Sequence, residues 1–196
     1  MKTICFTFII FFNLNSNIGT AGFKNFSNHY FVETGSFSGD GIQKALEANC
    51  FNKIYSIEFD KIHINTCNTR FKENKNVKII EGDSKNILWD IIKNLNRPIT
   101  FWLDAHIYPP IFDGTDGNKN APIIEELEQI KKHPIKTHTI LIDDMSCCGT
   151  LAFDYVTKQD LIKKIKEINP KYTITFIAGG DQDEVPDNIL FAYINN

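Results

Sequence analysis

The chain has 196 residues, of which 42% are hydrophobic and 23% charged, a size and composition typical of one globular domain with its own core. The formal net charge is −3 and the basic residues are spread along the sequence, which argues against a nucleic-acid-binding protein. The five cysteines form no C-x-x-C pair, which disfavours both a zinc site and a disulfide framework.

The first 21 residues have the pattern of a secretory signal peptide. Lys2 precedes the apolar run 4–12, and a polar stretch then leads to small residues that end at Ala21, as at a cleavage site. The apolar run is too short for a stable membrane span, and the alternative is a buried N-terminal strand or helix. We therefore expect either a secretory protein whose mature domain spans residues 22–196 or a cytoplasmic protein that keeps this segment.

Beyond about residue 28, short β-rich runs alternate with helical stretches. Strands are predicted at residues 31–34, 53–57, 77–80, 99–103 and 139–142, and helices at residues 41–48, 61–71, 84–95 and 158–168. A further helix follows Asn120, its expected N-cap, with Pro122 in the first turn. The alternation predicts an α/β domain with a mostly parallel sheet and helices on both faces.

Two last strands, at residues 172–177 and 189–194, have no helix between them. The turn that joins them is short and rich in Gly and Asp, so we expect an antiparallel hairpin at the edge of the sheet. The sequence shows no internal repeat and no second domain.

The loop after the first predicted strand carries the sharpest functional signal. It reads ETGSFSGDG from Glu33 to Gly41, and it leads from a strand into a helix. Glycines there let the backbone turn tightly and approach a ligand closely, and ligands of open α/β sheets lie beyond the carboxyl ends of strands. An ordinary strand-to-helix turn is the alternative. The residues predicted to bind a cofactor are Glu33, Gly35, Ser36, Phe37 and Gly39.

Acids after the next two strands suit the same site. Glu58 follows the second strand, where a carboxylate can accept hydrogen bonds from both ribose hydroxyls of an adenosine. Asp83 follows the third strand, at a position to contact an adenine amino group, and Ser84 is the expected cap of the next helix. The alternatives are a solvated acid for Glu58 and a plain N-cap for Asp83.

Together these residues resemble class I S-adenosylmethionine-dependent methyltransferases. The E-x-G-x-F-x-G-x-G loop, the acid after strand two and the G-D-S after strand three carry the resemblance, which covers residues 30–194. It implies a Rossmann-like, doubly wound, seven-stranded sheet with an antiparallel last strand. It also implies that Glu33 and Gly35 lie near the methionine part of S-adenosylmethionine, Glu58 at the ribose and Asp83 at the adenine. A nicotinamide-dependent dehydrogenase shares the first two signals, but it usually has G-x-G-x-x-G spacing, and Glu33 would repel a pyrophosphate.

Three more acids follow strands four and five, which are neighbours in that fold. Asp104 follows FWL, and Asp143 and Asp144 follow LI. Converging carboxylates repel one another unless they share a proton or a cation, and Mg²⁺ is the default oxygen-bound ion. The arrangement resembles metal-dependent O-methyltransferases of the catechol and macrolide-sugar types, which implies that these three residues hold the ion. The alternative is that Asp104 contacts only the cofactor and that Asp143 and Asp144 form a turn.

His106 is the candidate general base beside the catalytic Asp104, since an imidazole with a pKa near 6.5 suits proton transfer at neutral pH; a packing role is the alternative. The other four histidines are expected to be structural: His29, His63, His133 and His138. The loop 108–117 would cover the site. Its candidate acceptor contacts are Tyr108, Phe112, Asp113 and Asp116.

The resemblance predicts O-methylation of a small hydroxylated, sugar-like acceptor with the help of Mg²⁺. Three other functions stay open: a metal-independent methyltransferase that uses His106, a non-catalytic binding protein, and a nicotinamide-binding oxidoreductase. No nucleic-acid partner is expected, and a homo-oligomer is compatible with the sequence.

Overall fold

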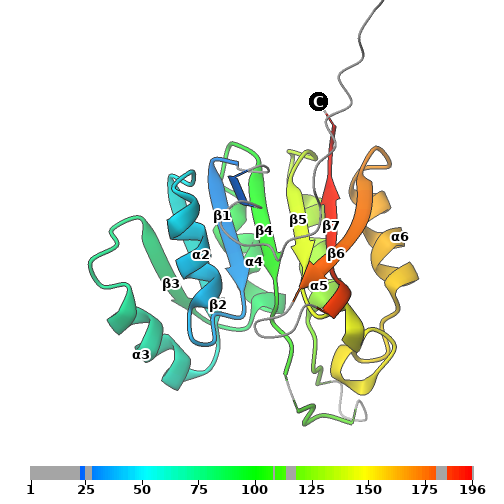
Figure 1. Ribbon diagram of the computed structural model, residues 1–196, viewed down its shortest axis with the longest axis horizontal. Helices are drawn as coiled ribbons and strands as arrows, with labels where there is room; N and C mark the ends of the chain where they lie inside the picture. The colour runs from blue at the N-terminus through cyan, green and yellow to red at the C-terminus, as the bar shows by residue number, and fades with distance from the viewer. Residues whose placement is uncertain (1–22, 25–27, 108, 114–117, 180–184, 196) are drawn as a thin grey trace, which may run out of the picture.

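The described part of the chain folds around a seven-stranded sheet. The computed structural model describes residues 23–24, 28–107, 109–113, 118–179 and 185–195. The strand order is β3-β2-β1-β4-β5-β7-β6 (Figure 1). The strands are β1 (Tyr30–Thr34), β2 (Lys53–Glu58), β3 (Val77–Glu81), β4 (Ile99–Leu103), β5 (Thr139–Ile142), β6 (Thr173–Gly179) and β7 (Val185–Tyr193). The predicted signal peptide, residues 1–21, lies outside the described residues.

The strand order reverses at β1, and this reversal sets the place for a ligand. β1 pairs in parallel with both β2 and β4, so the carboxyl ends of these three strands lie side by side. Such a switch point is where open α/β sheets bind ligands. The predicted closing hairpin is confirmed, since β6 and β7 pair antiparallel. β7 lies between β5 and β6, so β6 is the edge strand.

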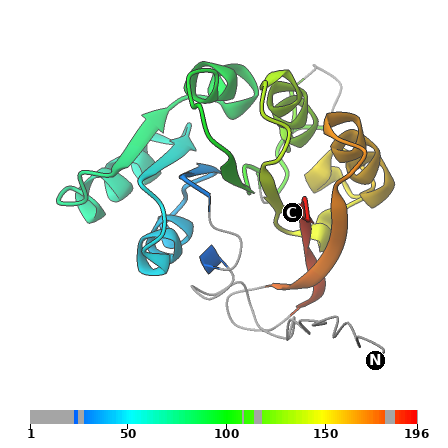
Figure 2. The same ribbon diagram turned by 90° about the horizontal axis from the view of Figure 1, so that it is seen from above.

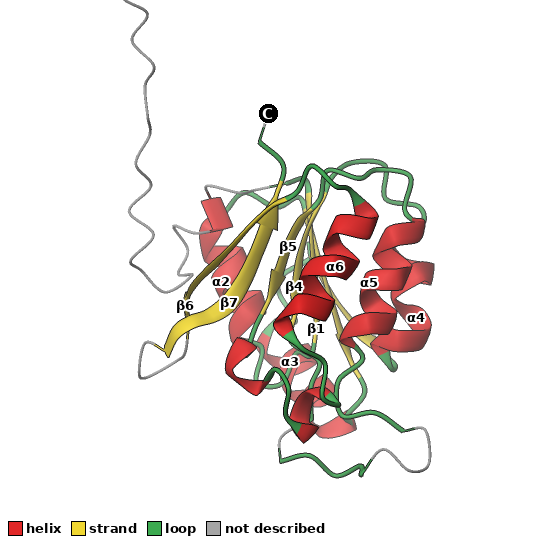
Figure 3. Cartoon of the chain, turned by 90° about the vertical axis from the view of Figure 1, so that its right-hand side faces the viewer, coloured by secondary structure: helices red, strands yellow, loops and turns green. Residues whose placement is uncertain are grey.

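Helices cover both faces of the sheet, as predicted (Figures 2 and 3). One face carries α2 (Asp40–Ala48) and α3 (Lys61–Arg70), and the other carries α4 (Ser84–Ile92), α5 (Ile123–Lys132) and α6 (Lys158–Ile168). All five residues of β4 are buried, as expected for a central strand with both faces covered. None of the described helices has both the length and the apolar character that a bilayer crossing needs.

Two predicted helix caps are wrong. The carboxylate of Asp83 caps α4 by accepting the Lys85 N–H at 3.1 Å, and Ser84 is the first residue of the helix. Helix α5 begins at Ile123 with Pro122 in the N-cap position. Asn120 is fully buried before the helix, and its side chain bonds to loop backbone instead.

Two of the histidines expected to be structural form a buried pair in the connection between α5 and β5. His138 Nδ1 accepts the Ile99 N–H at 3.1 Å, so its Nε2 carries the proton and donates to His133 Nδ1 at 3.1 Å. His133 Nε2 then donates to the Leu95 carbonyl at 3.0 Å. Burial, reinforced by His133 and Lys136, lowers the pKa of His138 to about 3. His138 is therefore neutral in the folded protein.

Candidate active site

The loop between β1 and α2 folds tightly against neighbouring strand ends. Gly35 has φ of +82° and Gly39 has φ of +88°, the left-handed region that favours glycine. A Cβ on Gly35 would collide with the carbonyl of Asp104, and one on Gly41 would collide with the carboxylate of Glu33. The glycines therefore let the loop lie directly against β4 and against the acid of β1.

Glu33 is buried under this loop with an exposed fraction of 1%. Its carboxylate accepts a hydrogen bond from Ser56 Oγ of β2, and that hydroxyl contacts Ser36 Oγ at 2.5 Å. Burial raises the pKa of Glu33 to about 8, against the lowering effect of the Ser56 hydrogen bond and with the help of the nearby Asp104 charge. The carboxyl group is therefore largely protonated at neutral pH unless a cation lies beside it.

Glu58 ends β2 and holds two turns together. Its Oε2 accepts the backbone N–H groups of Ser36 and Phe37, both at 3.0 Å, and its Oε1 accepts those of Phe59 and Asp60, both at 2.9 Å. The side chain is buried with an exposed fraction of 6%, so the solvated-acid alternative is wrong. Two carboxylate oxygens offer about four acceptor sites, and all four are used.

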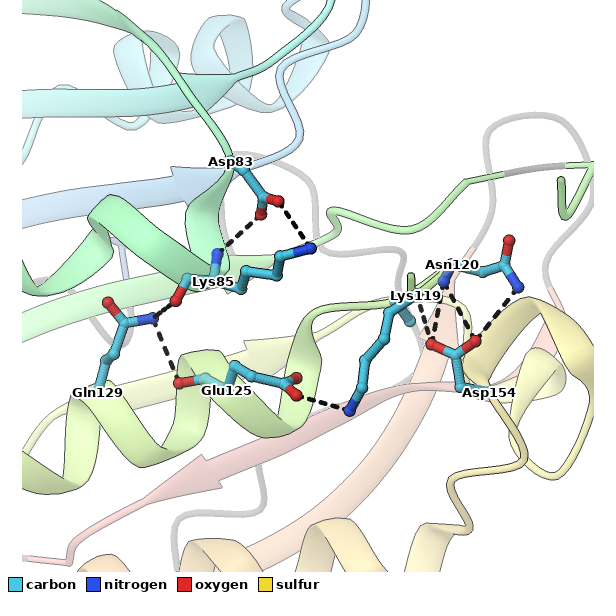
Figure 4. A network of polar contacts seen from close by, with 8 residues as sticks. Asp83, Lys85, Lys119, Asn120, Glu125, Gln129 and Asp154 are labelled. Carbon is cyan, nitrogen blue, oxygen red and sulfur yellow. Dashed lines mark hydrogen bonds and ion pairs between the residues drawn. The ribbon is translucent and has the colours of Figure 1, made fainter. Parts of the chain in front are cut away.

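The remaining predicted cofactor residues lie at the rim of this region. Phe37 has φ of +42°, and its side chain is exposed. The centroid of its ring lies 4.5 Å from that of the His63 ring. Asp83 lies at the end of the neighbouring strand β3, where it also pairs with the Lys85 ammonium at 3.0 Å (Figure 4). Ser84 is buried at the start of α4.

A carboxylate–imidazole–carboxylate group lies at the carboxyl ends of β4 and β5. His106 Nδ1 is 3.5 Å from Asp104 Oδ1, and His106 Nε2 is 3.4 Å from Asp144 Oδ2. One ligand atom from each of these residues lies within 4.8 Å of the others, a spacing that can hold a metal ion. Burial lowers the pKa of His106, but the two carboxylates outweigh it and the net pKa is raised. Burial raises the pKa of Asp104.

Asp143 lies near this group but has another partner. Its Oδ1 accepts the backbone N–H of Asp144 at 2.8 Å, and His106 takes its place in the metal-ligand group found among the described residues. Burial, followed by the charges of Asp104 and Asp144, raises the pKa of Asp143 to about 7. The three acids thus lie together at the carboxyl ends of β4 and β5. The group that can hold a metal ion contains two of the three predicted ligands, Asp104 and Asp144.

Asn188 of β7 holds Asp144 in place, and sequence reasoning missed it. Asn188 is 3% exposed; its Nδ2 donates to Asp144 Oδ1 at 3.2 Å and its Oδ1 accepts the Ser146 N–H at 3.0 Å. Asp144 has φ of +53°, a left-handed backbone conformation that is uncommon for residues other than glycine. No local pattern marks Asn188, because its partner is 44 residues away.

Glu126 of α5 is a second buried acid that the sequence did not single out. It is 1% exposed, and burial raises its pKa to about 7. With Asp104 and His106 it lines a small pocket of about 10 Å³. In the sequence Glu126 is one of several acids of an amphipathic helix, where an acid is expected to be exposed.

Two of the four predicted acceptor contacts can be placed. The Phe112 N–H donates to Asn120 Oδ1 at 3.0 Å, and Asp113 is exposed. Tyr108 and Asp116 lie outside the described residues.

Solved methyltransferases share this fold. The O-methyltransferase TomG from Streptomyces achromogenes, in complex with S-adenosylmethionine, has a TM-score of 0.58 at 13% identity over 90% of this chain and 78% of that chain. A Podospora anserina methyltransferase bound to S-adenosylhomocysteine has a TM-score of 0.58 at 14% identity over 90% of this chain and 76% of that chain. An rRNA methylase from Streptococcus thermophilus has a TM-score of 0.58 at 12% identity over 90% and 94%. No family model and no curated protein sequence matches the chain.

The chain therefore has the Rossmann-like fold of class I S-adenosylmethionine-dependent methyltransferases, and the predicted fold class is confirmed. Its structural neighbours include an O-methyltransferase and an rRNA methylase. A fold shared by such different substrates does not define the acceptor, which has to be argued from the site.

Proposed function

We propose that residues 22–196 form an S-adenosylmethionine-dependent methyltransferase that transfers a methyl group to a hydroxyl of a small, sugar-like acceptor. The buried acids at the carboxyl ends of β1, β4 and β5 support this most. Burial and mutual repulsion raise the pKa of Glu33 to about 8 and of Asp143 to about 7. Such acids fit a positively charged ligand. S-adenosylmethionine carries a sulfonium and an ammonium group, whereas a nicotinamide dinucleotide would bring a repelled pyrophosphate.

The cofactor would lie across the carboxyl ends of β1, β2 and β3. Glu33 would face its cationic methionine end, close to the glycine loop. Glu58 would accept the ribose hydroxyls in place of two of its present N–H donors, those of Ser36 and Phe37. Asp83 would lie at the adenine. When bound, the cofactor supplies an electrophilic methyl group, so the protein has to position and deprotonate the acceptor.

Asp104, His106 and Asp144 would perform that part of the reaction. Carboxylate oxygens are the ligands that Mg²⁺ prefers, and an imidazole suits a transition-metal ion, so the group fits a divalent cation. Such an ion lowers the pKa of a hydroxyl that binds it. Asp104 and Asp144 would hold the ion, and Asn188 would keep Asp144 oriented towards it.

The position of His106 supports a second candidate, metal-independent transfer. Its two ring nitrogens face two carboxylates at 3.5 and 3.4 Å, so an imidazolium there is stabilised without a metal ion. A neutral His106 would take the proton of the acceptor hydroxyl, and Asp104 and Asp144 would stabilise the imidazolium that forms.

The experiment is a transfer assay with methyl-tritiated S-adenosylmethionine, the full chain and a panel of sugars and other small hydroxylated compounds. We expect label in at least one acceptor. Loss of transfer on chelation, with recovery on adding Mg²⁺, supports the metal-assisted reaction. Transfer that survives full chelation but is lost in His106→Ala, and kept in the matched His29→Ala, supports the metal-independent one. A chain that transfers no label to any acceptor and does not bind S-adenosylhomocysteine contradicts the proposed function.

A further inference from the structure

We propose that Asn120 and Asp154 form a latch that positions His106 and builds the acceptor side of the site; this rests on the proposed function. The two residues belong to different connections. Asn120 ends the loop before α5, and Asp154 directly follows a short 3₁₀ helix, η2 (Leu151–Phe153), in the connection between β5 and α6. Their side chains meet face to face (Figure 4).

The carboxylate of Asp154 gathers the backbone at the start of α5. Its two oxygens accept the Asn120 N–H at 3.1 and 3.0 Å, and Oδ2 also accepts the Ala121 N–H at 3.0 Å. Asn120 Nδ2 donates to Oδ1 at 3.2 Å. Hydrogen bonds to an ionised acceptor are stronger than those between neutral groups. Asp154 has φ of +48°, so its backbone is shaped to present the carboxylate here.

The amide of Asn120 joins three segments. It is fully buried, and its Oδ1 accepts the N–H groups of Ile111 and Phe112, both at 3.0 Å. Its Nδ2 donates to the carbonyl of Phe112 at 2.8 Å and to that of Leu151 at 3.1 Å. An Asn side chain has two donors and one acceptor oxygen, and each of them is used. A side chain without both an amide N–H and an acceptor oxygen here would leave buried polar groups unpaired.

The latch reaches His106 from two sides. The carbonyl of Asn120 accepts the N–H of Ile107, the residue after His106, at 2.8 Å. The ring of Phe153, the residue before Asp154, lies 5.5 Å from the His106 ring between centroids. The contacts of His106 to the two carboxylates are long, at 3.4 and 3.5 Å. The orientation of the imidazole therefore depends on the backbone at His106 and on the ring of Phe153. The latch holds both of them in place.

The same latch joins segments that line the pocket at His106, because Ala121 and Phe153, the chain neighbours of Asn120 and Asp154, are among its lining residues. Ile111 and Tyr155 are large apolar side chains with exposed fractions of 68% and 65%, and they lie on the two segments that the latch joins. Asn120 and Asp154 are thus positioning residues. They act through His106 and through the two connections, without touching the reacting atoms.

The test uses the full chain labelled with ¹⁵N-histidine and reads the imidazole signals at one fixed pH. Asp154→Gly removes the carboxylate and keeps a residue suited to positive φ. Asp154→Asn keeps one acceptor oxygen and should show a smaller effect. Asp90→Asn, an exposed acid on α4 paired with Lys93, is the matched control. His106→Gln assigns the His106 signals.

We expect the His106 signals to move and broaden in Asp154→Gly and, less strongly, in Asp154→Asn. The signals of the His133–His138 pair should stay unchanged in the same spectra. Affinity for S-adenosylhomocysteine should change by less than about twofold, because Glu33 and Glu58 are untouched. Once an acceptor is known, kcat should fall about 10- to 100-fold with little change in KM for the cofactor.

Unchanged His106 signals in a folded Asp154→Gly protein overturn the latch. If that variant does not fold, Asp154→Asn decides in the same way. Failure of the proposed function has a different signature: the unchanged chain does not bind S-adenosylhomocysteine, while the His106 signals still report whether the latch positions the imidazole.

Discussion

Replacing Glu33 by Gln should abolish a proton release that accompanies cofactor binding. The free protein keeps this acid buried with a pKa of about 8, so at pH 7 the carboxyl group is about nine-tenths protonated. S-adenosylhomocysteine brings an ammonium group, which favours the ionised carboxylate. If binding returns the pKa to the ordinary value of 4.5, the group is almost fully ionised and about 0.9 proton leaves per ligand bound.

The sign of the pH dependence follows from this competition. Protons and the cationic ligand favour opposite states of Glu33, so affinity should rise with pH up to about 8 and then level off. Well below that pKa the slope approaches about tenfold in Kd per pH unit. In Glu33→Gln the slope and the proton release should both disappear, since a neutral amide of the same shape has no proton to lose.

Calorimetric titrations in buffers with different ionisation enthalpies measure the number of protons released. Glu47→Gln, on the exposed side of α2, is the matched control and should release as many protons as the unchanged chain. Binding of S-adenosylhomocysteine without proton release, or equal release by Glu33→Gln, would refute the placement of Glu33 beside the cationic end of the cofactor.

Three further perturbations test other parts of the site and fold. Gly41→Ala places a methyl group against the Glu33 carboxylate. We expect it to lower the free energy of unfolding in urea by about 1–3 kcal/mol. An unchanged unfolding midpoint would contradict the close packing of Gly41 against Glu33. Asn188→Ala removes the hydrogen bond to Asp144 and should weaken Mn²⁺ binding about 10- to 100-fold in a paramagnetic resonance titration. Equal Mn²⁺ affinity would contradict the positioning role of Asn188. The folded pKa of His138, about 3, lies below its ordinary 6.5, so its contribution to stability is present above pH 6.5 and is lost as pH falls towards 3. The free energy of unfolding should fall by up to about 1.4 kcal/mol per pH unit in that range, and His138→Phe should show a shallower slope in urea titrations; an equal slope would assign the acid sensitivity to other groups.

Local patterns in the sequence predicted the elements that carry the site. Predicted strands 99–103 and 139–142 and helix 158–168 agree with the observed bounds, because each is a continuous apolar run or an amphipathic helix with a clear start. β7 was predicted from residue 189 but begins at Val185. The segment Val185–Asn188 contains Pro and Asp and is exposed up to Asp187, so it has no strand-like alternation to recognise.

Contacts between distant segments explain what the sequence could not show. Asn120 was assigned to a helix cap because Asn is a good cap, yet its strongest partner, Asp154, is 34 residues away. Asn188 and Asp144 are 44 residues apart. The metal-ligand group was expected to contain Asp143. The Oδ1 atom of Asp143 accepts the Asp144 N–H, and the role of Asp143 as a metal ligand stays a prediction. Only the fold of the loop after β4 brings His106 between Asp104 and Asp144.

Titration of the full chain with S-adenosylhomocysteine, alongside a nicotinamide dinucleotide, is the most direct test of the proposed activity. We expect saturable binding of S-adenosylhomocysteine with a Kd in the micromolar range, about −8 kcal/mol, weakened by Glu58→Ala, and no binding of the dinucleotide. Binding of the dinucleotide with none of S-adenosylhomocysteine would contradict the proposal that this fold works as a methyltransferase.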